Sequence, residues 1–293
     1  MVTLLKVEDL DVKAPRRVAL PKMPKIAVWL AAFWLATLLF VAVFASWLPI
    51  APFDQPNFDA ARQGPSFSLH EPLGRDGLGQ SILSRLIYGA QISLAVGFLS
   101  VAFGLVFGVT LGIVAGYFGG WIDTVIGVFT DTLLSIPPLV LLLALAVTLS
   151  PSLGNLVISL GLLGLPTFLR IARANTLSIA KREYVAASAI LGAKRSRILL
   201  REILPNVITP PLAYSIEIVG VFIVAEASLS FLGLGIPPPR PSWGGMIAEG
   251  MSDMGRSVHI VAGPVVVLFL TVLALKIVGD RFRERLDVRE RVL

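Results

Sequence analysis

Three carboxylates lie inside long apolar segments of this sequence, where an ionised side chain is unusual: Asp131, Glu217 and Glu226. A charge at membrane depth is costly unless it is paired or faces water, so such residues can mark a solute or ion pathway. Asp131 lies near the end of its segment, where an interfacial carboxylate is the simpler interpretation. Glu217 could face a pathway or pair across a subunit interface. Glu226 could line an outer vestibule or hold the end of its helix in place.

Recognisable catalytic motifs are missing from the sequence. It contains no GxxxxGK[ST] phosphate-binding loop, no HExxH and no GxSxG. It has no cysteine, and its two histidines, His70 and His259, are far apart in the chain. We therefore predict no catalytic residue, no metal site and no cofactor in this chain. If ATP drives the protein, another chain binds it.

Residues 183–205, EYVAASAILGAKRSRILLREILP, form the longest polar interruption in the second half of the chain. Small and apolar residues recur within it at the helical spacing i, i+3, i+4, i+7: Glu183, Ala186, Ala187 and Ile190. Gly192 follows where a helix commonly ends, because glycine accepts the left-handed backbone conformation without steric cost. Such a segment, flanked by cations, is either a short helix that docks onto another protein or a solvated basic loop that fixes the membrane topology. Periodicity alone does not separate the two.

The elements that must position these residues are membrane-spanning helices. The chain has 293 residues, of which 55% are hydrophobic and 15% charged, against about 25% charged residues in ordinary soluble domains. Its mean hydropathy is +0.82. We predict an all-α integral membrane protein with six transmembrane helices, and we assign them to the apolar runs at about 26–48, 86–116, 139–149, 156–169, 203–231 and 258–278. Residues 121–131, before the third run, look amphipathic and interfacial.

Glycines recur every four residues in the second apolar run: Gly104, Gly108, Gly112 and Gly116. A stripe of small residues lets a neighbouring helix approach backbone to backbone in lipid, where packing drives helix association. The stripe predicts a helix-packing face. The neighbour could belong to this chain or to a partner subunit.

Lysine and arginine are distributed unevenly between the connections. Segments 1–25, 170–201 and 276–293 hold six, eight and six of them, whereas segments 49–81 and 232–257 hold two each. Positive residues stay in the cytoplasm. We therefore expect cytoplasmic tails at 1–25 and 281–293, a cytoplasmic loop at 170–202, and external segments at 49–85 and 232–257. The net charge of +6 is then a topology signal, and we predict no nucleic-acid partner.

The polar interruption resembles the EAA loop of ABC-importer membrane subunits, through Glu183, Ala186, Ala187, Gly192 and the ending Ile203-Leu204-Pro205. The spacing is similar to that of the dipeptide/oligopeptide/nickel permease family, in particular the second permease of the pair. The resemblance extends from about 73 to about 281 and includes LGRDGLGQSILSRLIYGAQISLAVG, EASLSFLGLG and PSWGGMIAEG. This sequence departs from the family pattern with Arg75 before Asp76 and with Gln80-Ser81 after Gly79. The departures put in doubt any salt bridge that the family makes there.

This resemblance implies a type I ABC-importer permease fold over 86–280 and a cytoplasmic coupling helix that sits in a groove of a separate ATP-binding subunit. The residues implied to couple to that subunit are Glu183, Tyr184, Ala186, Ala187, Leu191, Gly192 and Ala193. The implied partners are a homologous second permease, one or two ATP-binding subunits that hold ATP and Mg, and an extracytoplasmic substrate-binding protein, together in the cell (inner or plasma) membrane. Di- or oligopeptides are the first substrate expectation, ahead of nickel chelates, glutathione or other small solutes.

An ion-coupled secondary transporter is the alternative from another class. It would predict an inverted repeat and essential midplane carboxylates. No convincing repeat relates the first three apolar runs to the last three, and Glu217 is the only acid near mid-membrane. A membrane scaffold that transports nothing would leave the EAA-like spacing unexplained.

Overall fold

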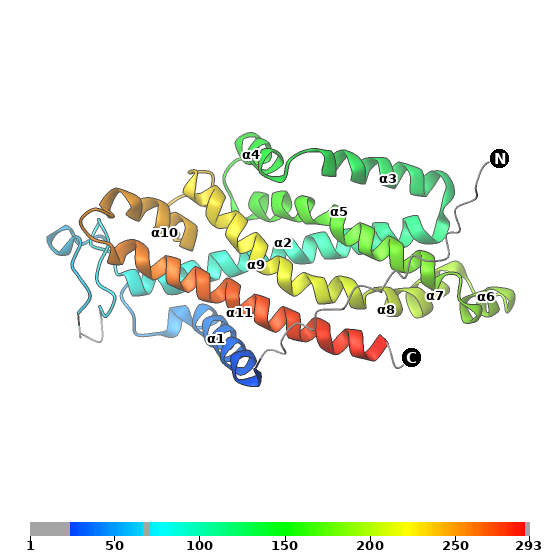
Figure 1. The fold of residues 1–293 in the computed structure, drawn as a ribbon. Helices are drawn as coiled ribbons and strands as arrows, with labels where there is room; N and C mark the ends of the chain where they lie inside the picture. The colour runs from blue at the N-terminus through cyan, green and yellow to red at the C-terminus, as the bar shows by residue number, and fades with distance from the viewer. Residues whose placement is uncertain (1–23, 67–70, 291–293) are drawn as a thin grey trace, which may run out of the picture.

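The computed structural model describes residues 24–66 and 71–290, which form an elongated bundle of helices (Figure 1). Most of the predicted N-terminal tail, and His70, lie outside the described residues. The helices are α1 Lys25–Val43, α2 Ile82–Phe118, α3 Gly120–Ser135, α4 Pro138–Thr148, α5 Leu153–Ile179, α6 Glu183–Ile190, α7 Arg195–Ile198, α8 Leu204–Val207, α9 Thr209–Phe231, α10 Trp243–Gly250 and α11 His259–Glu290. The all-α fold class is confirmed.

Within the described part of the chain, five helices are long and apolar enough to cross a membrane: α1, α2, α5, α9 and α11. A sixth span is obtained only if α3 and α4 count as one, and these two are bent by 92°. The predicted third span, 139–149, is therefore wrong as a span on its own, since α4 has 11 residues, or about 16 Å, against about 30 Å of hydrocarbon. The break has a local cause, because Ile136 precedes Pro137 and is extended (φ −87°, ψ 128°).

Three other predicted boundaries differ from the structure. The fifth apolar run, 203–231, is not one helix: Ile203 ends a π-helical turn that begins at Leu199, and α8 and α9 follow as separate helices. Prolines at positions 205, 210 and 211 lack the amide hydrogen that a continuous helix requires. The outer connection 232–257 is not all loop, because it contains α10, and the expected tail from 281 continues α11 as a helix to Glu290.

The glycine stripe of α2 lies against α5 of the same chain. A Cβ atom added at Gly108 would stand 2.7 Å from the carbonyl oxygen of Leu165, and one at Gly112 would stand 2.5 Å from that of Leu169. Gly104 and Gly116 meet the backbone of α5 in the same way. Only glycine allows this approach, so the stripe serves packing within the chain.

Replacing Gly112 with alanine is expected to destabilise the protein by about 1–3 kcal/mol, because the added methyl group must push α2 and α5 apart. Gly127→Ala in α3 is the matched control: it meets no atom within 4 Å, and alanine favours a helix by about 1 kcal/mol over glycine. The midpoint of thermal unfolding in detergent should fall for the first variant and hold or rise for the second. Equal midpoints would contradict this packing.

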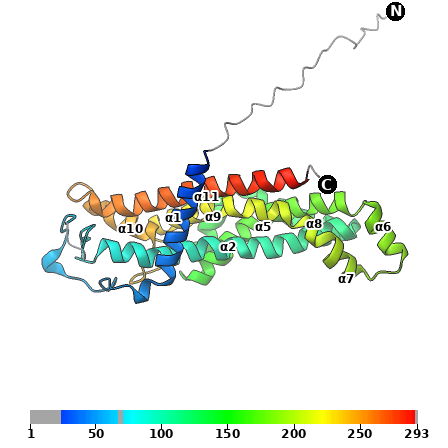
Figure 2. The same ribbon diagram turned by 90° about the horizontal axis from the view of Figure 1, so that it is seen from below.

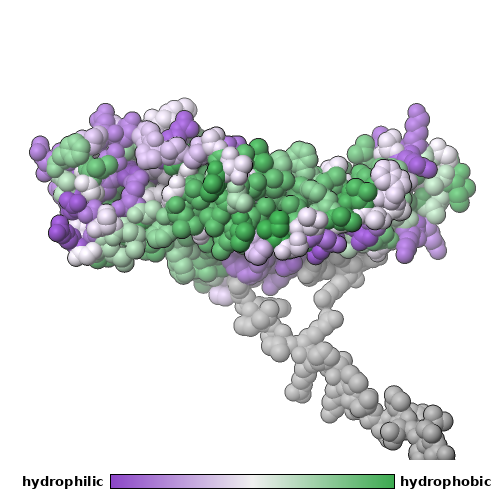
Figure 3. Space-filling model, turned by 90° about the horizontal axis from the view of Figure 1, so that it is seen from above, coloured by the Kyte–Doolittle hydropathy of each residue, from purple (hydrophilic) through white to green (hydrophobic). Residues whose placement is uncertain are grey.

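The surface divides into three zones along the bundle. Figure 3 shows apolar side chains across the middle of one face and polar side chains at both ends. The connection 49–81 and α10 lie at one end, and α6 lies at the other (Figures 1 and 2). The helices α1, α2, α3, α9 and α11 carry large exposed apolar side chains, among them Phe33, Phe107, Val128, Val221 and Phe269. The middle zone has the character of a surface that meets lipid or other membrane subunits.

Candidate functional site

The short helix α6 lies at one extremity of the molecule, beyond the end of α5 (Figure 1). It ends in two backbone hydrogen bonds: the amide of Gly192 donates to Ala189 at 3.1 Å, and the amide of Ala193 donates to Ser188 at 3.1 Å. Gly192 has φ +82°, the left-handed conformation that this Schellman-type ending requires. The turn therefore redirects the chain towards α7 through a geometry that glycine adopts without strain.

One side of α6 is packed against the rest of the chain, and its other sides are exposed. Val185 is buried in a cluster with Ile198 and Ile203. Ile190 and Leu191, in contrast, are 85% and 87% exposed. Glu183, Tyr184, Ala186, Ala187 and Gly192 are exposed as well, and Ala193 is half-buried. Apolar side chains grouped in the open on an otherwise polar tip indicate a surface for another protein.

Short connections on both sides join α6 to the long helices. The amide of Arg182 donates to Ile179 in the last turn of α5 at 3.0 Å, and the carbonyl of Arg182 accepts from Val185 at 3.1 Å. On the other side, Ile198 of α7 and Ile203 continue the buried cluster towards α9. α6 is therefore connected to α5 by backbone hydrogen bonds and, through α7 and Ile203, to the segment before α9 by buried contacts.

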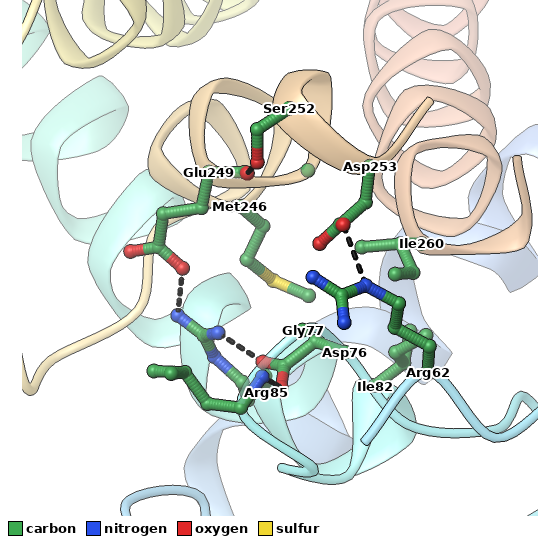
Figure 4. Close-up of a pocket in the computed structure, with 12 residues that line it drawn as sticks. Arg62, Asp76, Gly77, Ile82, Arg85, Met246, Glu249, Ser252, Asp253 and Ile260 are labelled. Carbon is green, nitrogen blue, oxygen red and sulfur yellow. Dashed lines mark hydrogen bonds and ion pairs between the residues drawn. The ribbon is translucent and has the colours of Figure 1, made fainter. Parts of the chain in front are cut away.

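The opposite end of the bundle carries a network of ion pairs (Figure 4). Arg85, in the first turn of α2, pairs with Asp76 and also with Glu249 of α10, the latter at 2.6 Å. Arg62 pairs with Asp253 at 2.6 Å across the same cavity. The cavity measures about 340 Å³ and also has apolar walls formed by Ile82, Met246 and Ile260. The network joins the 49–81 connection, α2 and α10 into one unit.

Asp76 is the centre of this network. Its Oδ1 accepts from the backbone amides of Leu78 and Gln80, both at 2.9 Å, while its other oxygen meets Arg85. Arg75, next to it, pairs instead with Glu71 at 2.8 Å. Sequence reasoning named Asp76 and Arg75 only as departures from a pattern and missed the pairing with Arg85 and Glu249. The available signal was the isolated cation Arg85 at the start of an apolar run.

Glu226 is fully buried where α2, α9 and α10 meet, with 0% of its surface exposed. Its carboxylate accepts from the hydroxyls of Ser93 at 3.2 Å and Ser230 at 2.7 Å. The Ser93 hydroxyl in turn accepts from the backbone amide of Trp243 at 3.2 Å. In this chain the carboxylate joins three helices, which favours the helix-end interpretation over the vestibule interpretation.

Glu226→Leu is expected to lower stability by about 1–3 kcal/mol, because it leaves two buried hydroxyl donors without their acceptor. Glu226→Gln keeps one acceptor oxygen and should cost less. If Glu226 lined the pathway, its substitution would instead alter transport and leave the midpoint of thermal unfolding unchanged. Changed uptake with an unchanged midpoint in both variants would therefore contradict the structural role.

The other two candidate carboxylates have partners of their own. Glu217 of α9 pairs with Lys276 of α11 at 2.6 Å and lies 3.8 Å from Arg283. Asp131 of α3 pairs with Arg170 of α5 at 2.7 Å, with both side chains largely exposed. The structure therefore does not bring Asp131, Glu217 and Glu226 together. Their role in a pathway stays a prediction.

Sequence reasoning also missed the pair that fastens α3 to α5. Arg173 donates to both oxygens of Asp123, at 2.5 Å and 2.6 Å. The two residues are 50 positions apart, and neither stands out by its neighbours in the sequence. Within the described residues, no group of three or more histidine, cysteine or acidic side chains has the arrangement of a metal site.

Comparison with known proteins gives one consistent match. The family model described as "Binding-protein-dependent transport system inner membrane component" matches residues 108–292. The glutathione transport system permease protein GsiD of Shigella dysenteriae serotype 1 is 40% identical over 260 residues, which covers 88% of this chain and 84% of that protein. GsiD of Escherichia coli O157:H7 matches with the same identity and coverage, 40% over 260 residues.

Among solved structures, an inward-facing conformation of the MetNI methionine ABC transporter is similar with a TM-score of 0.56 and 20% identity. The similarity covers 70% of this chain and 96% of that one. A second crystal form of the same transporter has a TM-score of 0.55 and 19% identity, with 70% and 97% coverage. At this identity the likeness concerns the fold alone.

Proposed function

Because this chain belongs to the family of binding-protein-dependent transport system inner membrane components, we propose that it forms half of the translocation pathway of an importer driven by ATP hydrolysis on separate subunits. The resemblance noted in the sequence is confirmed by this membership, and so is the type I ABC permease fold. The family implies ATP-binding, substrate-binding and second permease partners. We propose that this chain contacts the ATP-binding subunit through α6.

The observation that carries the proposal is the exposed apolar tip of α6. Ile190 and Leu191 are almost fully exposed, yet the helix beneath them is fixed by its glycine ending and by buried Val185. A rigid, apolar and short helix suits insertion into a groove of an ATP-binding subunit. Closure of those subunits would then push α6, swing α5 and α9, and alternate access to a cavity between two permeases.

The proposed orientation places α6, and both ends of the chain, in the cytoplasm. The excess of lysine and arginine near α6 and at the end of α11 supports it. The ion-pair network around Arg85 then faces outward, where a substrate-binding protein would dock. ATP and Mg would be held by the partner subunits, with no cofactor in this chain.

We propose a peptide-sized solute as the substrate, with glutathione as the first candidate. The support is the similarity to permease proteins named for glutathione transport, at 40% identity over 88% of this chain. Other di- or oligopeptides come next. An ion-coupled secondary transporter has no support from the family match.

The test is purification of the tagged full-length chain from its native membrane, followed by identification of the subunits that accompany it. We expect a homologous permease, one or two ATP-binding subunits and a binding protein. The intact assembly, reconstituted with ATP at the α6 side, should accumulate labelled glutathione only when ATP and the binding protein are both present. Uptake that follows an ion gradient, without any ATP-binding subunit, would overturn the proposal.

A further inference from the structure

A cavity of about 410 Å³ lies between the start of α1 and the end of α11. Figure 2 shows α1 crossing α11 on the surface of the bundle. The indole Nε1 of Trp34 donates to the hydroxyl of Thr271 at 3.2 Å and holds the two helices together. Six residues line the cavity, three apolar and three cationic: Val28, Trp29, Ala32, Lys25, Arg281 and Arg285.

The cations come from both helices and are mostly uncompensated. Arg281 pairs with Glu284 at 2.6 Å. Lys25 and Arg285 are exposed, and within the described part of the chain neither has a carboxylate in ion-pair distance. At Lys25 and Arg285 the cavity therefore concentrates positive charge that the described residues do not neutralise. An anion is the complementary occupant.

The position of the cavity along the bundle suits a lipid headgroup. Lys25 is the first residue of a predicted membrane span. Arg281 lies 22 positions after His259 in α11, which corresponds to about 33 Å of helix, close to the thickness of the hydrocarbon layer. Trp29 is 76% exposed at this level, and tryptophan is enriched at membrane–water interfaces.

We propose that this cavity binds the phosphate headgroup of an anionic phospholipid, with its acyl chains along the apolar side of α1. Basic pockets between transmembrane helices bind such headgroups. Lys25 and Arg285 would contact the phosphate, and Val28 and Ala32 the start of the chains. The site goes beyond the proposed transport function and depends only on the chain lying in a membrane.

The experiment is native mass spectrometry of the purified, complete assembly in detergent, titrated with phosphatidylglycerol or with phosphatidylcholine. We expect phosphatidylglycerol to be retained and phosphatidylcholine to be lost. The double variant K25A/R285A should weaken phosphatidylglycerol binding about fivefold for each cation removed. A competing titration with inorganic phosphate should not displace the lipid, because the apolar wall contributes to binding.

Arg283→Ala is the matched control. Arg283 lies in the same turn of α11 as Arg285 but does not line the cavity. Its substitution should leave phosphatidylglycerol binding unchanged. The proposal would be overturned by any of three results. These are equal binding of the two lipids, an equal loss of phosphatidylglycerol binding in K25A/R285A and in Arg283→Ala, and displacement of the lipid by inorganic phosphate. A cavity that binds no lipid in the full assembly, because another segment or subunit fills it, would overturn the proposal as well.

Discussion

Replacing Leu191 with aspartate is expected to abolish transport while the protein remains in the membrane. Leu191 is 87% exposed at the tip of α6, so the change costs the isolated chain little. In the proposed contact with an ATP-binding subunit, however, the new aspartate would be buried as an unpaired charge. Loss of a central contact residue typically costs about 2 kcal/mol or more, or about a 30-fold loss of affinity. Ala187→Arg should have the same effect through bulk and charge on the same exposed helix.

The measurement is ATP hydrolysis and labelled-solute uptake by the reconstituted assembly, side by side. Both variants should lose uptake, and the stimulation of ATP hydrolysis by the binding protein should disappear with it. Ser196→Arg, also exposed but in α7 beyond the glycine turn, adds the same positive charge as Ala187→Arg outside α6 and should retain uptake. Normal uptake by Leu191→Asp and Ala187→Arg would remove the basis for assigning coupling to α6.

Local features of the fold could be predicted from the sequence where the cause is itself local. The ending of α6 is an example, because glycine adopts the left-handed conformation that closes a helix with the least steric cost, and Gly192 stands at that position. The predicted start of α5, at 156, is three residues late, because the hydroxyl of Ser152 accepts from the amide of Asn155 at 3.2 Å and begins the helix at Leu153. The long apolar runs predicted most of the spans by length and composition.

Contacts between distant segments could not be predicted in this way. Arg85 and Glu249 are 164 positions apart, and Ser93 and Glu226 are 133 apart. The sequence around each of these four residues does not show which helix will face it in the fold. The glycine stripe predicted close packing but not its partner, since any helix backbone can approach a row of glycines; the structure identifies α5. The prolines at 137 and 138 are expected at a helix start or kink, and α4 does begin at Pro138. The prediction that the apolar run after them is a span of its own is wrong, because α4 has only 11 residues.

Two features of the chain suit it to transmit a push from α6. The glycines of α2 bring its backbone against that of α5, and interdigitated helices of this kind move as one unit. At the far end, Glu226 and the Arg85 network join α2 and α9 to α10. Between α6 and the outer end, the proposed push would therefore pass through packed helices and enclosed polar contacts.

Arg85→Leu is expected to lower the free energy of unfolding by about 3–5 kcal/mol, the cost of leaving a buried charge without its partner. The side chains of Arg85 and Asp76 are only 7% and 9% exposed. Without the arginine, Asp76 keeps two amide donors but no cation. The expected result is a lower midpoint of thermal unfolding in detergent and increased proteolysis of the 49–81 connection.

Two further variants separate the buried charge from loss of the arginine itself. Glu249→Gln removes the partner that is 47% exposed and should cost less than about 1 kcal/mol, as exposed pairs do. Asp76→Asn in the Arg85→Leu background removes the stranded charge but keeps a side-chain oxygen to accept from Leu78 and Gln80. The double variant should therefore be more stable than Arg85→Leu alone. If Asp76→Asn gave no recovery, the cost would lie in lost packing, and the outer network would not depend on charge pairing.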